Sequence, residues 1–210
     1  MKYSLLLLSL TACVVGCTRP PGQVDISSAE EYHVIATVID SLYRPSHQGA
    51  PLIFIDSTIV QSSVDSTIKM FKRGDSASNY LDLFATDSSF FEGRDSVELR
   101  RDFDSKNRQR WILFADSLRP KTQLIFQTSD QVNSVFALTT GNSWAVFRDK
   151  YHTNLGFMEV SRVGFNSKLN KAVVYVERYA GYENAEGTFV FLLKLNGQWI
   201  IHRQYMKWIS

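Results

Sequence analysis

The residues that decide the fold of this chain lie near its carboxyl end, at positions 188–201, and read TFVFLLKLNGQWII. Asn196 and Gly197 form an Asn-Gly pair between two apolar runs. Both residue types tolerate the positive φ angles that a type I′ turn needs, so the pair is a strong local signal for a β-hairpin. We therefore predict two antiparallel strands here, joined by a two-residue turn.

Two further runs precede this hairpin and have the same character. Residues 157–165 read FMEVSRVGF and residues 172–179 read AVVYVERY, with a polar segment at 166–170 between them. β-branched and aromatic residues of this kind fit a pleated, half-buried surface. Because the connections are short, consecutive strands are expected to be antiparallel neighbours. The sequence thus predicts a four-strand meander at the carboxyl end, with the last strand at 199–209.

The motifs of this meander resemble those of a family of uncharacterised secreted or lipid-anchored bacterial proteins. The motifs are VSRVGFN at 160–166, AVVYV at 172–176, NGQW at 196–199 and WIS at 208–210. The resemblance covers the carboxyl-terminal third well and the middle of the chain weakly. It implies a shared fold and a bacterial envelope setting. The family has no assigned activity, so no catalytic residue carries over. Family members often have cysteines in the loop that here spans 181–187, where this chain has none.

The amino terminus has the pattern of a bacterial lipoprotein signal. Lys2 precedes an apolar run at 3–15 that is too short to span a bilayer, and Val-Val-Gly then leads into Cys17. We predict a signal peptide at 1–16, lipidation of Cys17 and a Pro/Gly-containing tether at 17–26. Cys13 is an alternative lipidation site, and a plain secretory signal is another reading. The lipid anchor would make a membrane the first partner. Thr18, which is not acidic, favours the outer membrane.

Cys13 and Cys17 are the two cysteines of the chain. The predicted mature domain, 27–210, therefore has no disulfide, no cysteine zinc ligand and no cysteine nucleophile. The four histidines form no zinc-binding motif, and the chain contains no P-loop, no Gly-x-Gly-x-x-Gly and no Gly-x-Ser-x-Gly elbow. We expect no metal site and no cofactor. The basic stretch 94–110 is interleaved with acidic residues and lacks an aromatic platform, so we expect no nucleic-acid partner.

The rest of the chain predicts helices that cover the sheet. Residues 27–43 have apolar residues at helical spacing, and two possible capping boxes pair Ser27 with Glu30 and Ser28 with Glu31. A second helix is predicted from Asp95, as N-cap, with Glu98 reaching back. A third covers 142–151. Residues 52–55 and 124–126 read as strands. The predicted class is α+β: one domain with helices packed on an antiparallel sheet.

Six polar residues interrupt the apolar strands: Glu159, Arg162, Glu177, Arg178, His202 and Arg203. Five of them form the candidate ligand or partner surface: Arg162, Glu177, Arg178, His202 and Arg203. The ordinary reading is that they lie on the solvated face as cross-strand Glu–Arg pairs. Three function classes stay open. They are a non-catalytic envelope lipoprotein that binds another envelope protein, a small-ligand carrier or sensor with a pocket between sheet and helices, and a hydrolase with a spatially assembled site.

Overall fold

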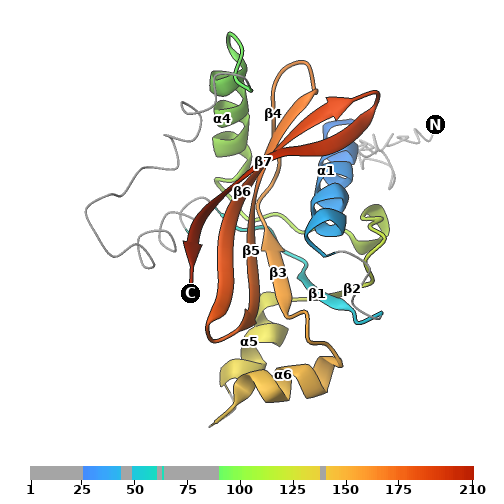
Figure 1. Cartoon of the computed structure of the whole chain (residues 1–210), viewed down its shortest axis with the longest axis vertical. Coiled ribbons are helices and arrows are strands. Elements are labelled where there is room, and N and C mark those ends of the chain that lie inside the picture. The colour runs from blue at the N-terminus through green and yellow to red at the C-terminus, as the bar shows by residue number, and fades with distance from the viewer. Residues whose placement is uncertain (1–25, 44–48, 61–62, 64–89, 138–140) are drawn as a thin grey trace, which may run out of the picture.

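The structure is a computed structural model that describes residues 26–43, 49–60, 63, 90–137 and 141–210 (Figure 1). The predicted signal peptide, Cys17 and residues 18–25 of the predicted tether lie outside the described residues. In the part of the chain that is described, no helix is long and apolar enough to cross a membrane.

The described strands form one seven-stranded sheet, in the order β2-β1-β3-β5-β6-β7, with β4 pairing to β5 beside β3. Figure 1 shows the three long strands β5, β6 and β7 twisting together along the length of the domain. The strands are β1 (Leu52–Ile55), β2 (Leu124–Gln127), β3 (Phe157–Val160), β4 (Gly164–Phe165), β5 (Lys171–Gly181), β6 (Asn184–Leu195) and β7 (Gln198–Ile209).

The carboxyl-terminal antiparallel meander is confirmed. Asn196 and Gly197 both have positive φ, at 50° and 80°, as the predicted turn requires. The first predicted strand is divided into β3 and β4, which both pair with β5. The predicted loop at 181–187 was too long, since β5 and β6 continue to a turn at residues 182 and 183. Ala185 is buried there, so the strand face is still used for packing.

β1 adds parallel pairings to this antiparallel arrangement. It pairs in parallel with β2, Leu52 opposite Leu124, and in parallel with β3, Ile53 opposite Phe157. All four residues of β1 are buried. A short run that is apolar on both faces is typical of a parallel strand covered on both sides. The class is α+β as predicted, and the sheet as a whole is mixed.

Helices cover both faces of the sheet. α1 (Ile26–Leu42) packs on one face with Val174, Val190 and Leu192. The described helices on the other face are α4 (Asp95–Lys106), α5 (Ser129–Ala137) and α6 (Ser143–Tyr151). Figure 1 shows α1 and α4 on opposite sides of the sheet, with α5 and α6 together at one end. The short 3-10 helix η2 (Ala115–Ser117) lies between α4 and β2 in the chain.

The predicted capping box at the start of α4 is wrong, whereas Ser27 and Ser28 of the boxes predicted at the start of α1 lie outside the described side chains. Glu30 binds Lys194 and Trp199, and Glu31 binds Arg162. Asp95 is the first residue of α4 rather than its N-cap, and it accepts hydrogen bonds from Asn166 and Lys171. Glu98 accepts a hydrogen bond from the backbone of Ser167. These carboxylates therefore tie their helices to distant segments.

α5 was not predicted, although its start carries a capping box. The Thr128 hydroxyl accepts from the backbone N–H of Gln131, and the Gln131 side chain accepts from the backbone N–H of Thr128. α6 begins as predicted, with Asn142 as N-cap accepting from Ala145. Its residues Trp144, Phe147 and Tyr151 share one buried face, also as predicted.

Candidate functional site

Two of the charged strand residues, Glu159 and Glu177, are brought together by the register of the sheet. Glu159 on β3 lies directly opposite Glu177 on β5. The same row continues through Gly187 on β6 to Trp208 on β7. The two glutamates lie on one face, between the apolar cluster under α4 and the cluster under α5 and α6. The site is thus at a boundary between two packed regions.

Two tyrosines of the same strand hold the Glu177 carboxylate. The Tyr175 hydroxyl donates to Oε1 at 3.0 Å, and the Tyr179 hydroxyl donates to Oε2 at 2.7 Å. Residues at i, i+2 and i+4 of a strand point to one face, which places both hydroxyls beside the carboxylate between them. Trp208 Nε1 donates in turn to the Tyr175 hydroxyl at 2.7 Å. A chain of donors therefore runs from the indole to the carboxylate.

Gly187 makes room for this chain of hydrogen bonds. A Cβ atom at this position would lie 2.0 Å from Trp208 Nε1 and 2.3 Å from the Tyr175 hydroxyl. Real Cβ contacts of this kind do not occur at such distances, so any side chain here would displace the indole or the phenol. The glycine is needed for space, because its backbone is in an ordinary strand conformation.

Glu159 has a different environment from Glu177. Its side chain is partly buried, and it makes no hydrogen bond or ion pair with any residue that the structure describes. Burial and the neighbouring Glu177 raise the pKa of Glu159 to about 7, although Arg110 acts in the opposite direction. Burial and Glu177 also raise the pKa values of Tyr175 and Tyr179, so both phenols stay protonated as donors. Glu159 is the group of this cluster that changes charge near neutral pH.

Arg110 and two serines lie on the Glu159 side of the cluster. Arg110 Nη1 is 3.4 Å from the Ser57 hydroxyl and 3.5 Å from the Ser129 hydroxyl, and the two hydroxyls are 3.4 Å apart. Arg110 is exposed, whereas Ser57 is buried. We call Glu159, Glu177, Tyr175, Tyr179 and Trp208 the glutamate–tyrosine cluster. Chemically it offers an ionisable carboxyl, a hydrogen-bonded carboxylate and two phenol donors.

The other candidate residues lie apart from this cluster. Arg162 makes two hydrogen bonds to Glu31, at 2.6 and 3.1 Å, and both side chains are largely buried. Arg178 forms an ion pair with Glu186 at 3.0 Å. Tyr43, whose pKa is raised by burial, lies close to that pair. These two arginines therefore act in ion pairs that join segments of the fold.

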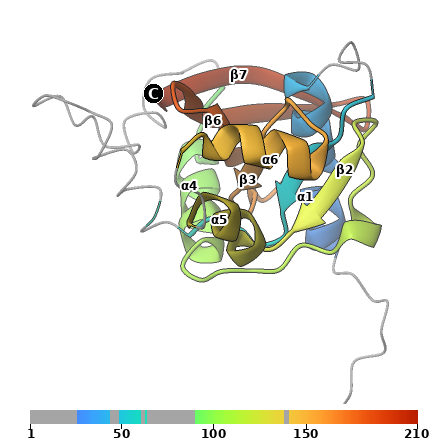
Figure 2. The ribbon, with the colours of Figure 1, turned by 90° about the horizontal axis from the view of Figure 1, so that it is seen from below.

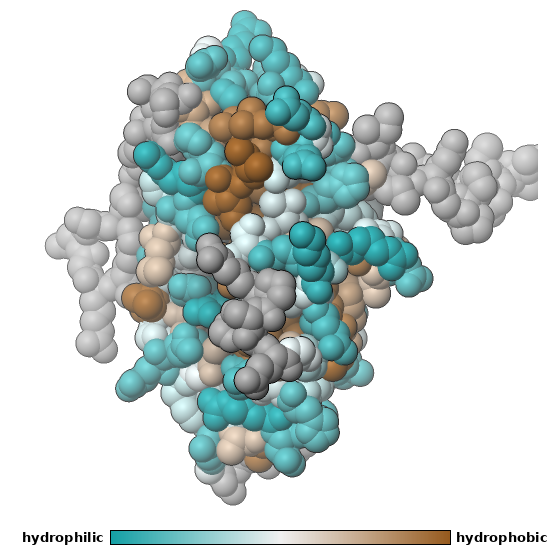
Figure 3. Space-filling view, turned by 45° about the vertical axis from the view of Figure 1, so that its right-hand side comes forward, coloured by the Kyte–Doolittle hydropathy of each residue, from teal (hydrophilic) through white to brown (hydrophobic). Residues whose placement is uncertain are grey.

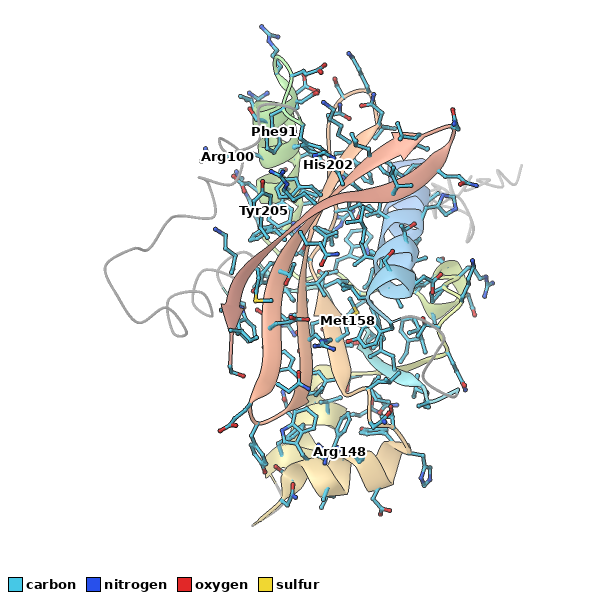
Figure 4. The ribbon with its side chains drawn as sticks, in the orientation of Figure 1. Phe91, Arg100, Arg148, Met158, His202 and Tyr205 are labelled. Atoms are coloured by element: carbon cyan, nitrogen blue, oxygen red, sulfur yellow. The ribbon has the colours of Figure 1, made fainter. Side chains whose placement is uncertain are left out.

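His202 and Arg203 meet the aromatic cluster beneath α4. β7 has an irregular register between Ile201 and Arg203, and the bulge turns His202 to this side. Its ring stacks on Phe90, with centroids 4.9 Å apart. Arg203 Nη1 donates to the Tyr205 hydroxyl at 3.0 Å. Figure 4 shows His202 and Tyr205 near Phe91, beside α4.

Sequence reasoning named Glu159 and Glu177 but did not pair them. Tyr175, Tyr179, Trp208 and Gly187 are not among the candidate residues that the sequence indicates. The signal that could have found the tyrosines is the pattern Tyr-x-Glu-x-Tyr at 175–179, since these three side chains share one strand face. The role of Trp208 and Gly187 depends on the register of β6 and β7 and has no local signal.

An open groove of about 630 Å³ lies between α4 and the segment after β4. Three of its four charged residues already bind neighbours: Lys106 pairs with Asp102 at 2.7 Å, and Glu98 accepts from Ser167. This groove therefore offers weaker grounds for a site than the glutamate–tyrosine cluster. The described residues contain no group of three or more His, Cys, Asp or Glu side chains placed to hold a metal ion.

No family model, curated protein or solved structure matches this chain.

Proposed function

We propose that this protein is a lipid-anchored bacterial envelope protein whose domain binds a positively charged group at the glutamate–tyrosine cluster. In this proposal the domain is a non-catalytic binding module. The group is an ammonium or a guanidinium, either on another envelope protein or on a small ligand. The resemblance of the carboxyl-terminal strands to uncharacterised secreted or lipid-anchored bacterial proteins supports the envelope setting.

The observation that carries the binding proposal is the direct opposition of Glu159 and Glu177. Like charges directly opposite one another in a sheet are destabilising. A cation placed between them would remove that repulsion, so part of the free energy of binding is stored in the unliganded domain. Aromatic rings surround the pair, with Tyr179 stacked on Phe157 at 4.8 Å. Aromatic faces also attract ammonium and guanidinium groups.

The binding proposal is tested by thermal unfolding with defined cations. Spermidine and L-arginine serve as small probes, and a lysine-rich peptide represents a protein partner. We expect at least one probe to raise the melting temperature at pH 8 and to have much less effect at pH 5, where Glu159 is protonated. The effect should be lost in Glu159→Gln and kept in Glu183→Gln, an exposed control. Equal shifts in both variants, or no shift with any probe at pH 8, would contradict the proposal.

The anchor is tested separately by fractionation of the bacterial host. We expect Cys17→Ser to release the protein from the membrane fraction and Cys13→Ser to leave it there. The reverse result would place the lipid on Cys13. Release by neither substitution would contradict lipidation. The absence of an acidic residue after Cys17 leads us to propose the outer membrane, and density separation of the two membranes tests this location.

The unequal surroundings of the two glutamates favour a second candidate function, hydrolysis by general acid–base chemistry. Pairs of carboxyls with different environments are a common basis for acid and base roles. A panel of chromogenic glycosides and esters, assayed from pH 5 to pH 8, would test it. Turnover that disappears in Glu159→Gln would replace the binding proposal with this one. Turnover that is unchanged in the variant would exclude the cluster as the source.

A further inference from the structure

Three large apolar side chains are exposed next to one another in the segment between α4 and η2. Trp111 is 45% exposed, Ile112 is 52% exposed and Phe114 is 61% exposed. Leu113, between them, is buried in the core beside α1. Single exposed apolar residues need no explanation, but a contiguous group of this kind marks an interaction surface. We call residues 111–114 the apolar segment.

The backbone of the apolar segment is fixed on both sides. The N–H of Thr58 donates to the carbonyl of Trp111 at 2.8 Å, and the N–H of Leu113 donates to the carbonyl of Asp56 at 2.6 Å. The N–H of Phe114 donates to the Tyr32 hydroxyl of α1 at 3.0 Å. The apolar side chains are thus held in solvent by a segment that is tied to both β1 and α1.

Trp111 is also held by a cation. The Arg162 guanidinium lies 4.3 Å from the centre of the Trp111 ring, and Glu31 fixes that guanidinium with two hydrogen bonds. The indole is therefore oriented before it meets any partner. A side chain that is already ordered loses less conformational entropy when it binds.

Basic residues flank the apolar segment in the sequence. Between positions 108 and 121 the chain has four basic residues and one acidic residue, Asp116. The basic residues are exposed, and they are Arg108, Arg110, Arg119 and Lys121. Aromatic and aliphatic residues flanked by arginine and lysine are the composition that favours the interface of an anionic bilayer. This charge distinguishes the surface from a purely apolar docking patch.

The apolar segment lies beside the second turn of α1, through Glu31 and Tyr32. Figure 2 shows the chain between α4 and β2 running past α1 along one side of the domain. α1 begins at Ile26, and Cys17 precedes it by nine residues in the sequence. Nine residues reach at most about 30 Å when fully extended. A lipid on Cys17 would therefore hold the start of α1 within about 30 Å of the membrane.

We propose that the apolar segment is a second membrane contact, in which Trp111, Ile112 and Phe114 enter the interface of an anionic bilayer. The flanking arginines and Lys121 lie at the level of the lipid headgroups. This contact rests on the proposed lipid anchor, and fluorescence quenching reports the contact while fractionation reports the anchor. Figure 3, in which the right-hand side of Figure 1 comes forward, shows a mostly hydrophilic face with a compact hydrophobic patch in its upper half.

The test uses the lipidated protein on vesicles that contain phosphatidylcholine and phosphatidylglycerol. Because Cys13 and Cys17 are the only native cysteines, Ala115→Cys provides a single labelling site that leaves the apolar segment intact. A fluorophore there is exposed to lipids carrying a nitroxide in the interfacial region. Val146→Cys, an exposed position on α6, is the control. We expect at least twofold more quenching at position 115 than at position 146.

Ile112→Ser with Phe114→Ser should reduce quenching at position 115 to the control level. Val97→Ser, which alters an exposed apolar residue of α4, should leave it unchanged. The unfolding midpoints of both variants verify that the domain stays folded. Equal quenching at positions 115 and 146 would overturn the proposal. The proposal would also be overturned if the fluorophore at position 115 were shielded only when an envelope protein was added, because the apolar segment would then contact a protein. Loss of the anchor through Cys17→Ser abolishes membrane binding in fractionation and is distinguishable from loss of this contact.

Discussion

Glu159 and Glu177 face each other across the antiparallel pair of β3 and β5, with only one of the two carboxyls held by tyrosine hydroxyls. Since Glu159 makes no hydrogen bond within the described part of the chain, its ionisation is opposed by both burial and Glu177. The arrangement costs stability in the folded domain and keeps a titrating carboxyl beside a fixed one.

This opposition predicts an unusual dependence of stability on pH. The pKa of Glu159 is raised from 4.5 to about 7. Its contribution to stability is therefore fully present below pH 4.5, falls between pH 4.5 and 7, and is absent above. A difference of this size corresponds to a few kcal/mol at most. Glu159→Gln should raise the free energy of unfolding at pH 8 and have little effect at pH 4.5.

The measurement for Glu159→Gln is urea unfolding at several pH values between 4.5 and 8. Glu183→Gln, in the exposed turn between β5 and β6, should behave as wild type at every pH. If Glu159→Gln changed the free energy of unfolding by the same amount at pH 8 as at pH 4.5, the carboxyl would not be held in the environment described.

Gly187→Ala should destabilise the domain by about 3 kcal/mol, because the added methyl group would overlap Trp208 and Tyr175 and disrupt their hydrogen bond. Gly181→Ala is the matched control, since its Cβ would meet only Asn184 Cβ, at an ordinary 3.5 Å. Urea unfolding of both variants measures the difference. Similar midpoints for the two would show that the indole is not held against Gly187.

The ion pair between Glu31 and Arg162 should contribute more to the free energy of unfolding than an exposed ion pair does. Arg162→Met should cost about 3 kcal/mol, because it removes the nearer cation from buried Glu31 and leaves only Lys106, 3.4 Å from the same carboxylate. The double variant Glu31→Gln with Arg162→Met should recover part of that loss. Arg100 and Asp104, an exposed pair at 3.6 Å, provide the comparison, and Arg100→Met should cost less than about 1 kcal/mol. A double-mutant cycle by chemical denaturation measures the coupling free energy of Glu31 and Arg162. If the effects of the two single substitutions simply add, the prediction is contradicted.

Glu30 should contribute stability that is lost in acid. Burial raises its pKa, but the hydrogen bonds from Lys194 and Trp199 outweigh burial, so its pKa lies below the usual 4.5. A lowered pKa in the folded state gives stability that is present above pH 4.5 and disappears as the pH falls through the folded value. Glu30→Gln should therefore destabilise the domain at pH 7 and lose less stability than wild type between pH 4.5 and 3. Thermal unfolding across this range measures the difference. If the hydrogen bonds to Glu30 do not form, the melting temperatures of Glu30→Gln and wild type will depend on pH in the same way.

The elements that the sequence predicted well are those whose signals are local. The Asn196–Gly197 turn and the apolar face of α6 follow from neighbouring residues alone. The parallel position of β1 does not, because its partners Leu124 and Phe157 are far away in the chain. The same reason explains why Asp95 is not the N-cap of α4. Its carboxylate binds Asn166 and Lys171, distant donors that no local pattern contains.

The candidate site was predicted only in part, for a related reason. The charges at Glu159 and Glu177 were visible as interruptions of apolar strands, whereas their opposition depends on the register between β3 and β5. Arg162 and Arg178 interrupt strands in the same way but form ion pairs that join the fold. A charge within a strand therefore identifies a position that needs a partner, and the register determines which partner it has.

The place of β1 in the sheet also has a consequence for the order in which the chain folds. β5, β6 and β7 are consecutive and can pair as soon as they are made, since their contacts are local. β1 is synthesised early, but its neighbours are separated from it by long stretches of chain. Its four apolar residues therefore wait without partners until most of the polypeptide exists. During synthesis, this unpaired strand needs protection from aggregation.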